Sequence, residues 1–292
     1  MLVKPVALLM GSESIMFNTF SLDTHTKFDN KINSKGWFVA SDFVGDADFL
    51  ARMKQLVNHY VAVYRKEQTK KGIAKEMNRG TVHHILVKED LVLQLLEGIM
   101  AEFKVPLENF FGGKYILNTI GGNFLYDVTP YYGLIHRDVR SHTRDINLMC
   151  QLLIPLDNFT ANNGATRILS GSHVDKSKPT KEYFLEHAES AVADRGSLIF
   201  FNSNCWHAAG VNHSTEDRAS IIVTLSAPFV KPQFDYVRYV ESSNIRNLSE
   251  NLKQLLGYYS RIPSTLDEWV QPTEKRMYQN DQETQYYSKY KN

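Results

Sequence analysis

Apolar residues recur every three or four positions in the first third of the chain. Over residues 46–71 they lie on one face of a helix, and this set comprises Phe49, Leu50, Met53, Leu56, Val57, Tyr60, Val61 and Tyr64. Residues 88–103 follow the same period, although Gly98 within them weakens the helical pattern. Pro106 is expected to begin a short third helix that ends at Gly112.

After residue 113 the period of the apolar positions shortens to two, which is typical of strands. One strand-like segment, residues 36–40, precedes this point, and the others are residues 114–120, 123–128, 131–138, 145–154, 196–201, 206–211 and 218–226. Gly121-Gly122 is expected to separate two of them, and residues 162–164 form a turn. Helices followed by closely spaced strands indicate an α+β unit, mainly β, with a sandwich or barrel of strands as its core.

The pattern contains no internal repeat and no linker that would divide the chain. We therefore expect a single domain over residues 1–292. Its parts are a helical N-terminal part at about 42–112, a strand core at about 113–230 and a C-terminal extension at 231–292. The helices and the extension could build part of a substrate pocket or a contact in a homo-oligomer.

Composition and charge exclude several classes of protein. Lys and Arg total 33 against 32 for Asp and Glu, so no overall charge favours nucleic acid or an anionic membrane as a partner. The only cysteines, Cys150 and Cys205, form neither a disulfide framework nor a Cys-x-x-Cys metal site. No apolar segment is long enough for a membrane span, and the N-terminus does not resemble a signal peptide. The expectation is a soluble cytoplasmic protein with a small-molecule partner.

A histidine and an aspartate lie two residues apart in the segment 131–138. On a strand, residues i and i+2 point to the same face, so His136 and Asp138 can present an imidazole and a carboxylate to one point. These are two of the three ligands of a two-histidine, one-carboxylate site for non-haem Fe(II). The pair alone is a weak signal, since it arises readily by chance.

The downstream pattern supplies the groups that such a site needs. His207 follows an apolar strand and could be the third ligand. Arg218 opens the next strand, where the period of two places Ser220 on the same face. A guanidinium and a hydroxyl on one face suit a carboxylate, which the arginine can bind in a bidentate manner.

Together these elements resemble the phytanoyl-CoA dioxygenase-like family of Fe(II)/2-oxoglutarate oxygenases. The resemblance covers roughly residues 110–230. The matching motifs are His136-Arg137-Asp138, the run from Asn163 to His173, the run from Arg195 to Phe201, His207 and Arg218. Ser170 is a departure, because the family usually has proline before Gly-Ser-His, and its loss puts the rigidity of that turn in doubt.

The resemblance implies a double-stranded β-helix (jelly roll) with helices packed against one sheet. It implies that His136, Asp138 and His207 bind Fe(II), and that Arg218, with Ser220 and Asn118, binds the co-substrate 2-oxoglutarate. O2 would take the last metal position. The expected reaction is oxidation, most simply hydroxylation, of a C–H bond of a small metabolite, with release of succinate and CO2. Asp138 disfavours a halogenase, which lacks this carboxylate.

Each of these residues also has an ordinary structural interpretation. The histidines could be core residues with satisfied nitrogens, Asp138 could pair with a neighbouring arginine, and Arg218 could be an edge-strand residue. Tyr132, Arg140 and Arg144 could contact the substrate, the arginines by clamping a carboxylate or phosphate, or they could be ordinary strand and loop residues.

Two other functions remain open. One is a non-oxidative, cupin-like metal or ligand-binding protein, which would have no need of a buried co-substrate anchor at Arg218. The other is a zinc hydrolase on the same three ligands, which would need a general base that the sequence does not supply.

Overall fold

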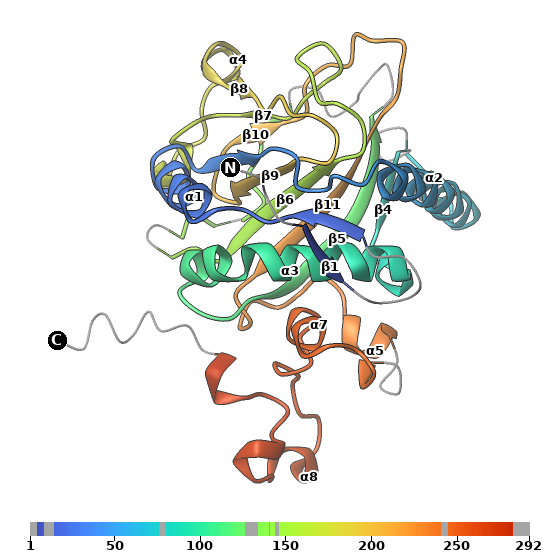
Figure 1. Ribbon diagram of the computed structural model, residues 1–292, viewed down its shortest axis with the longest axis vertical. Coiled ribbons are helices and arrows are strands. Elements are labelled where there is room, and N and C mark those ends of the chain that lie inside the picture. The colour runs from blue at the N-terminus through green and yellow to red at the C-terminus, as the bar shows by residue number, and fades with distance from the viewer. Residues whose placement is uncertain are drawn as a thin grey trace, which may run out of the picture.

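The computed structural model describes residues 5–8, 15–75, 80–125, 134–139, 141–143, 146–240 and 245–282, and combines helices with antiparallel sheets (Figure 1). The α-helices are α1 (Leu22–Lys35), α2 (Ala47–Lys70), α3 (Asp90–Phe111), α4 (Lys181–His187), α5 (Tyr236–Val240), α7 (Glu250–Leu255) and α8 (Leu266–Trp269). The strands are β1 (Pro5–Leu8), β2 (Ile15–Asn18), β3 (Trp37–Ala40), β4 (Thr81–His83), β5 (Ile116–Leu125), β6 (Met149–Pro155), β7 (Arg167–Ile168), β8 (Glu189–Ser190), β9 (Leu198–Asn202), β10 (His207–Ala208) and β11 (Arg218–Ser226). Short 3-10 helices occupy Ile85–Lys88, Ser172–Val174, Thr273–Lys275 and Asn280–Gln282.

The largest sheet has six antiparallel strands in the order β3-β9-β6-β11-β5-β4. Its central strand β11 is buried on both faces, and its side chains alternate between two environments. Ala219, Ile221, Val223 and Leu225 join the hydrophobic core that α2 and α3 close. The opposite face, called the inner face below, carries Arg218, Ser220, Thr224 and Ser226. One strand therefore serves both the core and a polar surface inside the protein.

A three-stranded sheet, in the order β10-β7-β8, covers part of the inner face. Leu153, Ile199 and Phe201 of the large sheet pack in one cluster with Ile168 of β7 and with Cys205, which lies just before β10. Because apolar burial is the main stabilising term in folding, this cluster holds the two sheets together. It also brings the segment before His207 against the inner face.

The structure corrects one prediction in the helical part. A single helix, α3, continues through Pro106, which was predicted to start a new one. Proline lacks an N–H donor and usually breaks a helix, but here Leu107 and Phe110 extend the buried stripe beyond it. Gly98 lies within the same helix and allows the Phe17 ring to pack closely against it, because a Cβ at this position would lie 2.6 Å from that ring.

Two strand predictions also change. Gly121 and Gly122 do not interrupt β5, which runs from Ile116 to Leu125. A Cβ at Gly122 would meet Val57 of α2 at 2.4 Å, so the glycines allow close packing and do not form a turn. Of the predicted strand 131–138, residues 131–133 lie outside the described part, and His136 pairs only through an isolated antiparallel bridge to His207.

Other predicted elements are confirmed. The amphipathic segment 46–71 is α2, capped by the Asp46 carboxylate, and β11 begins and ends at the residues predicted. Ser170, where the family usually has proline, is held by side chains: its hydroxyl accepts from Trp37 Nε1 at 2.8 Å and donates to Glu189. These bonds provide a constraint that the missing proline would otherwise have supplied.

The C-terminal extension is built from α5, α7 and α8, and Figure 1 shows it in orange and red at one end of the molecule. In the parts of the chain that the structure describes, no helix combines the length and apolarity needed to cross a bilayer.

Candidate metal centre

His136, Asp138 and His207 meet because two backbone segments pair. The amide of His136 donates to the carbonyl of His207 at 3.0 Å, and the amide of His207 donates back at 2.9 Å. The amide of Asp138 donates to the carbonyl of Ser203 at 3.1 Å. The segment carrying His136 and Asp138 thus runs beside the loop before β10, and main-chain bonds fix their alignment.

The three side chains converge on one point. The Asp138 carboxylate lies 3.7 Å from Nε2 of His136 through one oxygen and 3.5 Å from Nε2 of His207 through the other. Their candidate ligand atoms all lie within 4.8 Å of one another. Two nitrogens and one carboxylate oxygen on one side of a point leave the other side open, which is the arrangement of a facial triad.

Hydrogen bonds orient both imidazoles. Nδ1 of His136 lies 2.8 Å from the carbonyl oxygen of Leu134, and Nδ1 of His207 lies 3.0 Å from that of Cys205. A carbonyl only accepts, so each Nδ1 carries the proton and each Nε2 presents a lone pair toward Asp138. Such bonds fix the tautomer and ring orientation of metal-binding histidines.

Burial favours the form of His207 that binds metals. The residue is 6% exposed, and burial lowers its pKa, with an opposing effect from Asp138 and a smaller lowering effect from His136. The neutral imidazole is the form that coordinates a metal. The Phe201 ring, 4.8 Å from that of His207, closes one side of the site.

Arg218 is buried on the inner face, and no described residue forms an ion pair with it. Its guanidinium carbon lies 3.8 Å from the centre of the Phe159 ring. Nε and Nη1 are buried and have no hydrogen-bond partner among the described residues. Burial lowers its pKa to about 9, while the Asp157 carboxylate acts in the opposite direction. Buried charges are normally paired, so these donors indicate a site for an anion.

Comparison with known sequences identifies the family. The family profile described as phytanoyl-CoA dioxygenase matches residues 128–220, a stretch that contains the three candidate ligands and Arg218. The uncharacterized protein Rv1501 of Mycobacterium tuberculosis is 30% identical over 274 residues, covering 91% of this chain and 97% of that protein. The chain belongs to the phytanoyl-CoA dioxygenase family.

More distant relatives agree with this assignment. The dioxygenase cdmD of Talaromyces verruculosus is 25% identical over 122 residues, which cover 41% of this chain and 39% of that protein. The crystal structure of SnoN, a non-heme alpha ketoglutarate dependent epimerase from nogalamycin biosynthesis, has a TM-score of 0.52 at 13% identity. It covers 70% of this chain and 84% of that one, and shows a shared fold. Membership of the phytanoyl-CoA dioxygenase family supports an oxygenase of the Fe(II)/2-oxoglutarate type.

The remaining residues predicted for a phytanoyl-CoA dioxygenase site lie in different places. Ser220 is buried two residues after Arg218 on the same strand. Asn118 lies toward the other end of β11, where its amide nitrogen is 3.3 Å from Ser226 Oγ and 3.4 Å from the Lys231 carbonyl. The predicted substrate contacts Tyr132, Arg140 and Arg144 lie outside the described residues.

A pair of buried polar side chains on the inner face was not predicted. The Thr224 hydroxyl of β11 donates to Gln151 Oε1 of β6 at 2.7 Å. Gln151 lies directly across from Phe201 in the pairing of β6 with β9, and Phe201 contacts His207. The sequence did hold a signal, because Gln151 alternates with the apolar residues Cys150 and Leu152 and so faces the other side of the strand.

Two residues near the site have structural roles. Burial raises the pKa of the Cys205 thiol to about 12, so it acts as a small buried side chain and not as a nucleophile. In the Gly-Ser-His turn, the Ser172 hydroxyl accepts from the amide of Trp206 at 2.9 Å and donates to the Leu169 carbonyl at 2.6 Å. The turn therefore supports the segment that carries His207.

Proposed function

We propose that the protein is an Fe(II)/2-oxoglutarate-dependent dioxygenase that hydroxylates a C–H bond of a small-molecule metabolite, releasing succinate and CO2, and that it acts in secondary metabolism. The observation that carries this proposal is the convergence of His136, Asp138 and His207 within 4.8 Å. The family supports the class of reaction, and the fungal relatives of this chain include the dioxygenases cdmD and cdmA of Talaromyces verruculosus.

The donor set fits Fe(II). Two imidazoles with free Nε2 lone pairs and one carboxylate are the ligands that non-haem Fe(II) oxygenases use, and they leave positions for a chelating co-substrate and O2. In this proposal His136, Asp138 and His207 hold the metal. Bound Fe(II) would supply O2 activation coupled to the oxidative decarboxylation of 2-oxoglutarate.

Arg218 supports 2-oxoglutarate as the co-substrate. A guanidinium with two unpartnered buried nitrogens fits the distal carboxylate of a dicarboxylic acid, which would satisfy both donors. Ser220 would add one hydroxyl donor from the same face. Asn118 lies seven residues along β5 from Leu125, the residue opposite Arg218, which is too far for it to contact the same ligand. A cupin-like binding protein without oxidation has no need of such an anchor, so Arg218 favours the oxygenase.

The protein's own groups have distinct tasks in this reaction. The carbonyls of Leu134 and Cys205 hold the two imidazoles in one tautomer, so no proton has to leave Nε2 when the metal binds. The Phe201 ring and the buried inner face exclude water from the reacting centre, which strengthens the electrostatic interactions there. Tyr132, Arg140 and Arg144 would contact the metabolite.

The fold that accompanies this function is a double-stranded β-helix within a single domain. The six-stranded antiparallel sheet and the smaller sheet that packs over its inner face support that architecture, as does the fold shared with SnoN.

Anaerobic titration of the protein with Fe(II) and 2-oxoglutarate tests the proposal. The expected result is the weak visible charge-transfer band of the Fe(II) chelate, absent in His207→Ala. Adding O2 and a library of metabolites should then give substrate-stimulated succinate formation. Product mass distinguishes hydroxylation, which adds one oxygen atom, from stereoinversion, which leaves the mass unchanged. No band from folded wild-type protein would refute the proposal.

A further inference from the structure

Asp157 lies close to Arg218 in the fold but does not pair with it. In the antiparallel pairing of β6 with β11, Ser220 lies opposite Pro155. Continuing this register by two residues places Asp157 opposite Arg218, and opposed residues in such a pair normally contact each other. An arginine and an aspartate in that relation are expected to form an ion pair. Among the residues that the structure describes, the Nε and Nη1 atoms of Arg218 nevertheless have no hydrogen-bond partner.

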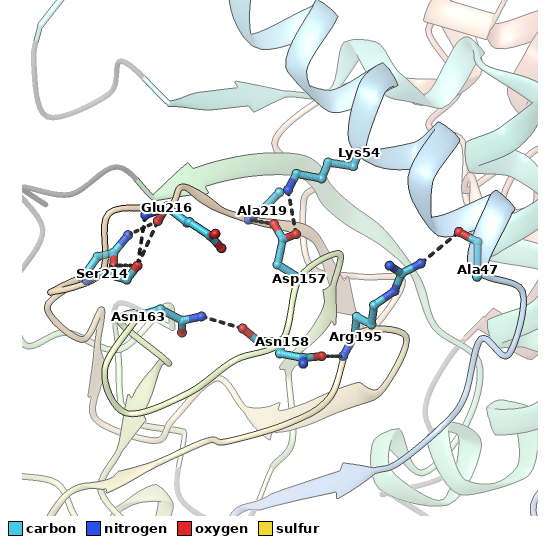
Figure 2. Close-up of polar contacts among 10 residues, drawn as sticks. Ala47, Lys54, Asp157, Asn158, Asn163, Arg195, Ser214, Glu216 and Ala219 are labelled. Carbon is cyan, nitrogen blue, oxygen red and sulfur yellow. Dashed lines mark hydrogen bonds and ion pairs between the residues drawn. The ribbon is translucent and has the colours of Figure 1, made fainter.

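Lys54 and a backbone amide occupy both oxygens of the Asp157 carboxylate. Oδ1 accepts from the Lys54 ammonium of α2 at 2.6 Å, and Oδ2 accepts from the amide of Ala219 at 2.9 Å (Figure 2). The Lys54 and Asp157 side chains are 38% and 28% exposed, so the pair is partly shielded from water. The carboxylate that could neutralise Arg218 is therefore turned toward the helix.

The turn that carries Asp157 is fixed from a second direction. The Asn158 side-chain oxygen accepts from the amide of Arg195 at 2.8 Å, and the Arg195 guanidinium donates to the carbonyl of Ala47 at 2.9 Å. Figure 2 shows both contacts beside the Lys54–Asp157 pair. Ala47 and Lys54 belong to the same helix, α2. The backbone of the turn is thus fixed against α2, so Asp157 can change its partner only by rotating its side chain.

Charge explains why this arrangement matters. Lys54 and Arg218 are two cations near one anion, Asp157, so the group has an excess positive charge. That excess lies on the buried guanidinium, and a bound anion would offset the free-energy cost of its desolvation. Without the Lys54 ammonium, the Asp157 carboxylate could turn and occupy the donors of Arg218.

We propose that Lys54 is a positioning residue for the co-substrate anchor, holding the Asp157 carboxylate away from Arg218 so that the guanidinium stays free for 2-oxoglutarate. This inference rests on the proposed function, because it assumes that Arg218 binds the distal carboxylate. Asp157 would compete with 2-oxoglutarate for the Arg218 guanidinium, and Lys54 of α2 prevents this by binding the Asp157 carboxylate.

A double-mutant experiment on the full-length protein tests this competition. The probe is 2-oxoglutarate, titrated by calorimetry into iron-free protein and by the chelate band into Fe(II)-loaded protein. Lys54→Met should weaken binding about tenfold, because Asp157 then competes for the buried guanidinium. Asp157→Asn should bind within about twofold of the wild type. The double variant Lys54→Met/Asp157→Asn should recover the wild-type affinity.

The double variant separates competition from simple loss of positive charge. It lacks the Lys54 charge but also lacks the competing carboxylate, so only competition predicts recovery. Affinity that stays as weak in the double variant as in Lys54→Met would overturn the proposal, and so would unchanged affinity in Lys54→Met. Lys54→Arg keeps a cation for Asp157 and should retain affinity. Lys66→Met, at an exposed lysine of the same helix, is the matched control.

Two further measurements keep the test independent of folding and of the proposed function. A crystal structure of Lys54→Met should show a carboxylate oxygen of Asp157 within about 4 Å of an Arg218 nitrogen. An Asp157 carboxylate still turned toward α2 would contradict the inference even if affinity fell. If wild-type protein binds no 2-oxoglutarate at all, the proposed function fails. If it binds and Lys54→Met binds equally well, only the present inference fails.

Discussion

The metal-ligand cluster and Arg218 differ in how far the protein encloses them and in how their polar atoms are satisfied. The His136 and Asp138 side chains are 46% and 26% exposed, and both imidazoles have backbone hydrogen-bond partners. Arg218 is 4% exposed, and in the described part of the chain two of its nitrogens have no hydrogen-bond partner. Backbone hydrogen bonds therefore orient the imidazoles of the ligand cluster, whereas the buried donors of Arg218 would be satisfied by a bound anion.

This difference shows two ways of preparing a binding site. At the candidate metal centre, short-range hydrogen bonds to backbone carbonyls set the geometry of the imidazoles, and water can solvate the exposed groups. Arg218 is buried because it belongs to the central strand β11, and an unpaired buried charge costs several kcal/mol in real proteins. We expect that removing a group from the first site mainly costs function, whereas removing Arg218 costs function but gains stability.

The largest effect is expected from His207→Ala. The loss of a group that merely orients a metal ligand costs about 10- to 100-fold in affinity or activity, and loss of the ligand itself should exceed this. Fe(II) content after anaerobic dialysis and 2-oxoglutarate turnover are the measurements. His213→Ala, at an exposed histidine outside the cluster, is the control and should keep both. Iron binding that survives in His207→Ala would remove this residue from the ligand set.

Arg218→Met should have opposite effects on binding and on stability. We expect about a 100-fold loss of 2-oxoglutarate affinity, because charge-assisted hydrogen bonds each contribute about 1.5–3 kcal/mol. The free energy of unfolding of the ligand-free protein should rise by about 1–4 kcal/mol, as when buried ionic groups are replaced by apolar ones. Titration calorimetry and urea unfolding measure the two quantities.

Arg167→Met is the matched control for the stability effect. Arg167 donates to the carbonyls of Leu185 and Ala188 at 2.7 and 2.9 Å, so its charge is hydrogen-bonded. Its replacement should lower the free energy of unfolding, because two carbonyls lose their donor. If both arginine variants lose stability, Arg218 is better satisfied than the structure indicates, and the contrast between the two regions disappears.

Gly36→Ala should disturb the metal centre through packing. Gly36 has φ +81°, and a Cβ there would lie 2.5 Å from both Cys205 Sγ and His173 Nδ1. Strain and overpacking together should lower the free energy of unfolding by about 2–4 kcal/mol. Because the Cys205 carbonyl orients His207, iron affinity should fall as well.

Gly72→Ala separates the two causes. Gly72 has φ +68° with nothing within 4 Å of the added Cβ, so only the backbone cost, about 1 kcal/mol, is expected. Urea unfolding and iron titration of both variants provide the comparison. Equal losses in the two variants would show that contact with Cys205 and His173 does not matter.

His84→Asn tests whether burial is costly when a hydrogen-bond partner is present. His84 has φ +65° and ψ −45°, outside the left-handed helical region, and its Nδ1 lies 2.9 Å from the Tyr236 hydroxyl. Burial, with a smaller effect of His83, lowers its pKa to about 4. Between about pH 6.5 and pH 4, His84 is therefore protonated in the unfolded chain but neutral in the folded protein. The free energy of unfolding consequently falls as the pH decreases toward 4.

The variant should flatten this part of the pH profile. Because His84 is only half-buried, we expect the loss of wild-type stability between about pH 7 and about pH 5 to shrink by about 1 kcal/mol. Urea unfolding at both pH values measures it, with His213→Asn as the control. Equal slopes in all three proteins would assign the pH dependence to other groups.

Local sequence patterns predicted the elements that depend on local periodicity. The three- and four-residue spacing gave α2, and alternation gave β11 at the observed residues. α1 was missed because few of its residues, among them Phe28 and Ile32, are buried apolar positions. Pro106 and the Gly121-Gly122 pair predict boundaries, yet α3 and β5 continue through them because tertiary packing stabilises the longer elements.

The candidate site divides in the same way. The sequence contained the two histidines, the aspartate and the arginine in the order typical of the family, and the period of two placed Ser220 beside Arg218. The regular strand that was to align His136 with Asp138 is, in the described part, an isolated bridge to His207. The convergence of the three side chains is therefore set by pairing with a distant segment, not by the alternation of one strand.

Local spacing indicates which chemical groups the protein has and which of them share a face of a strand, because backbone geometry repeats over a few residues. Tertiary packing brings His207 to His136 and Asp138. It also buries Arg218 with no hydrogen-bond partner for Nε and Nη1 among the described residues, and it turns Asp157 toward Lys54. Those outcomes depend on contacts between residues far apart in the chain. Their free energies come from burial and from competition among partners, which no local spacing encodes.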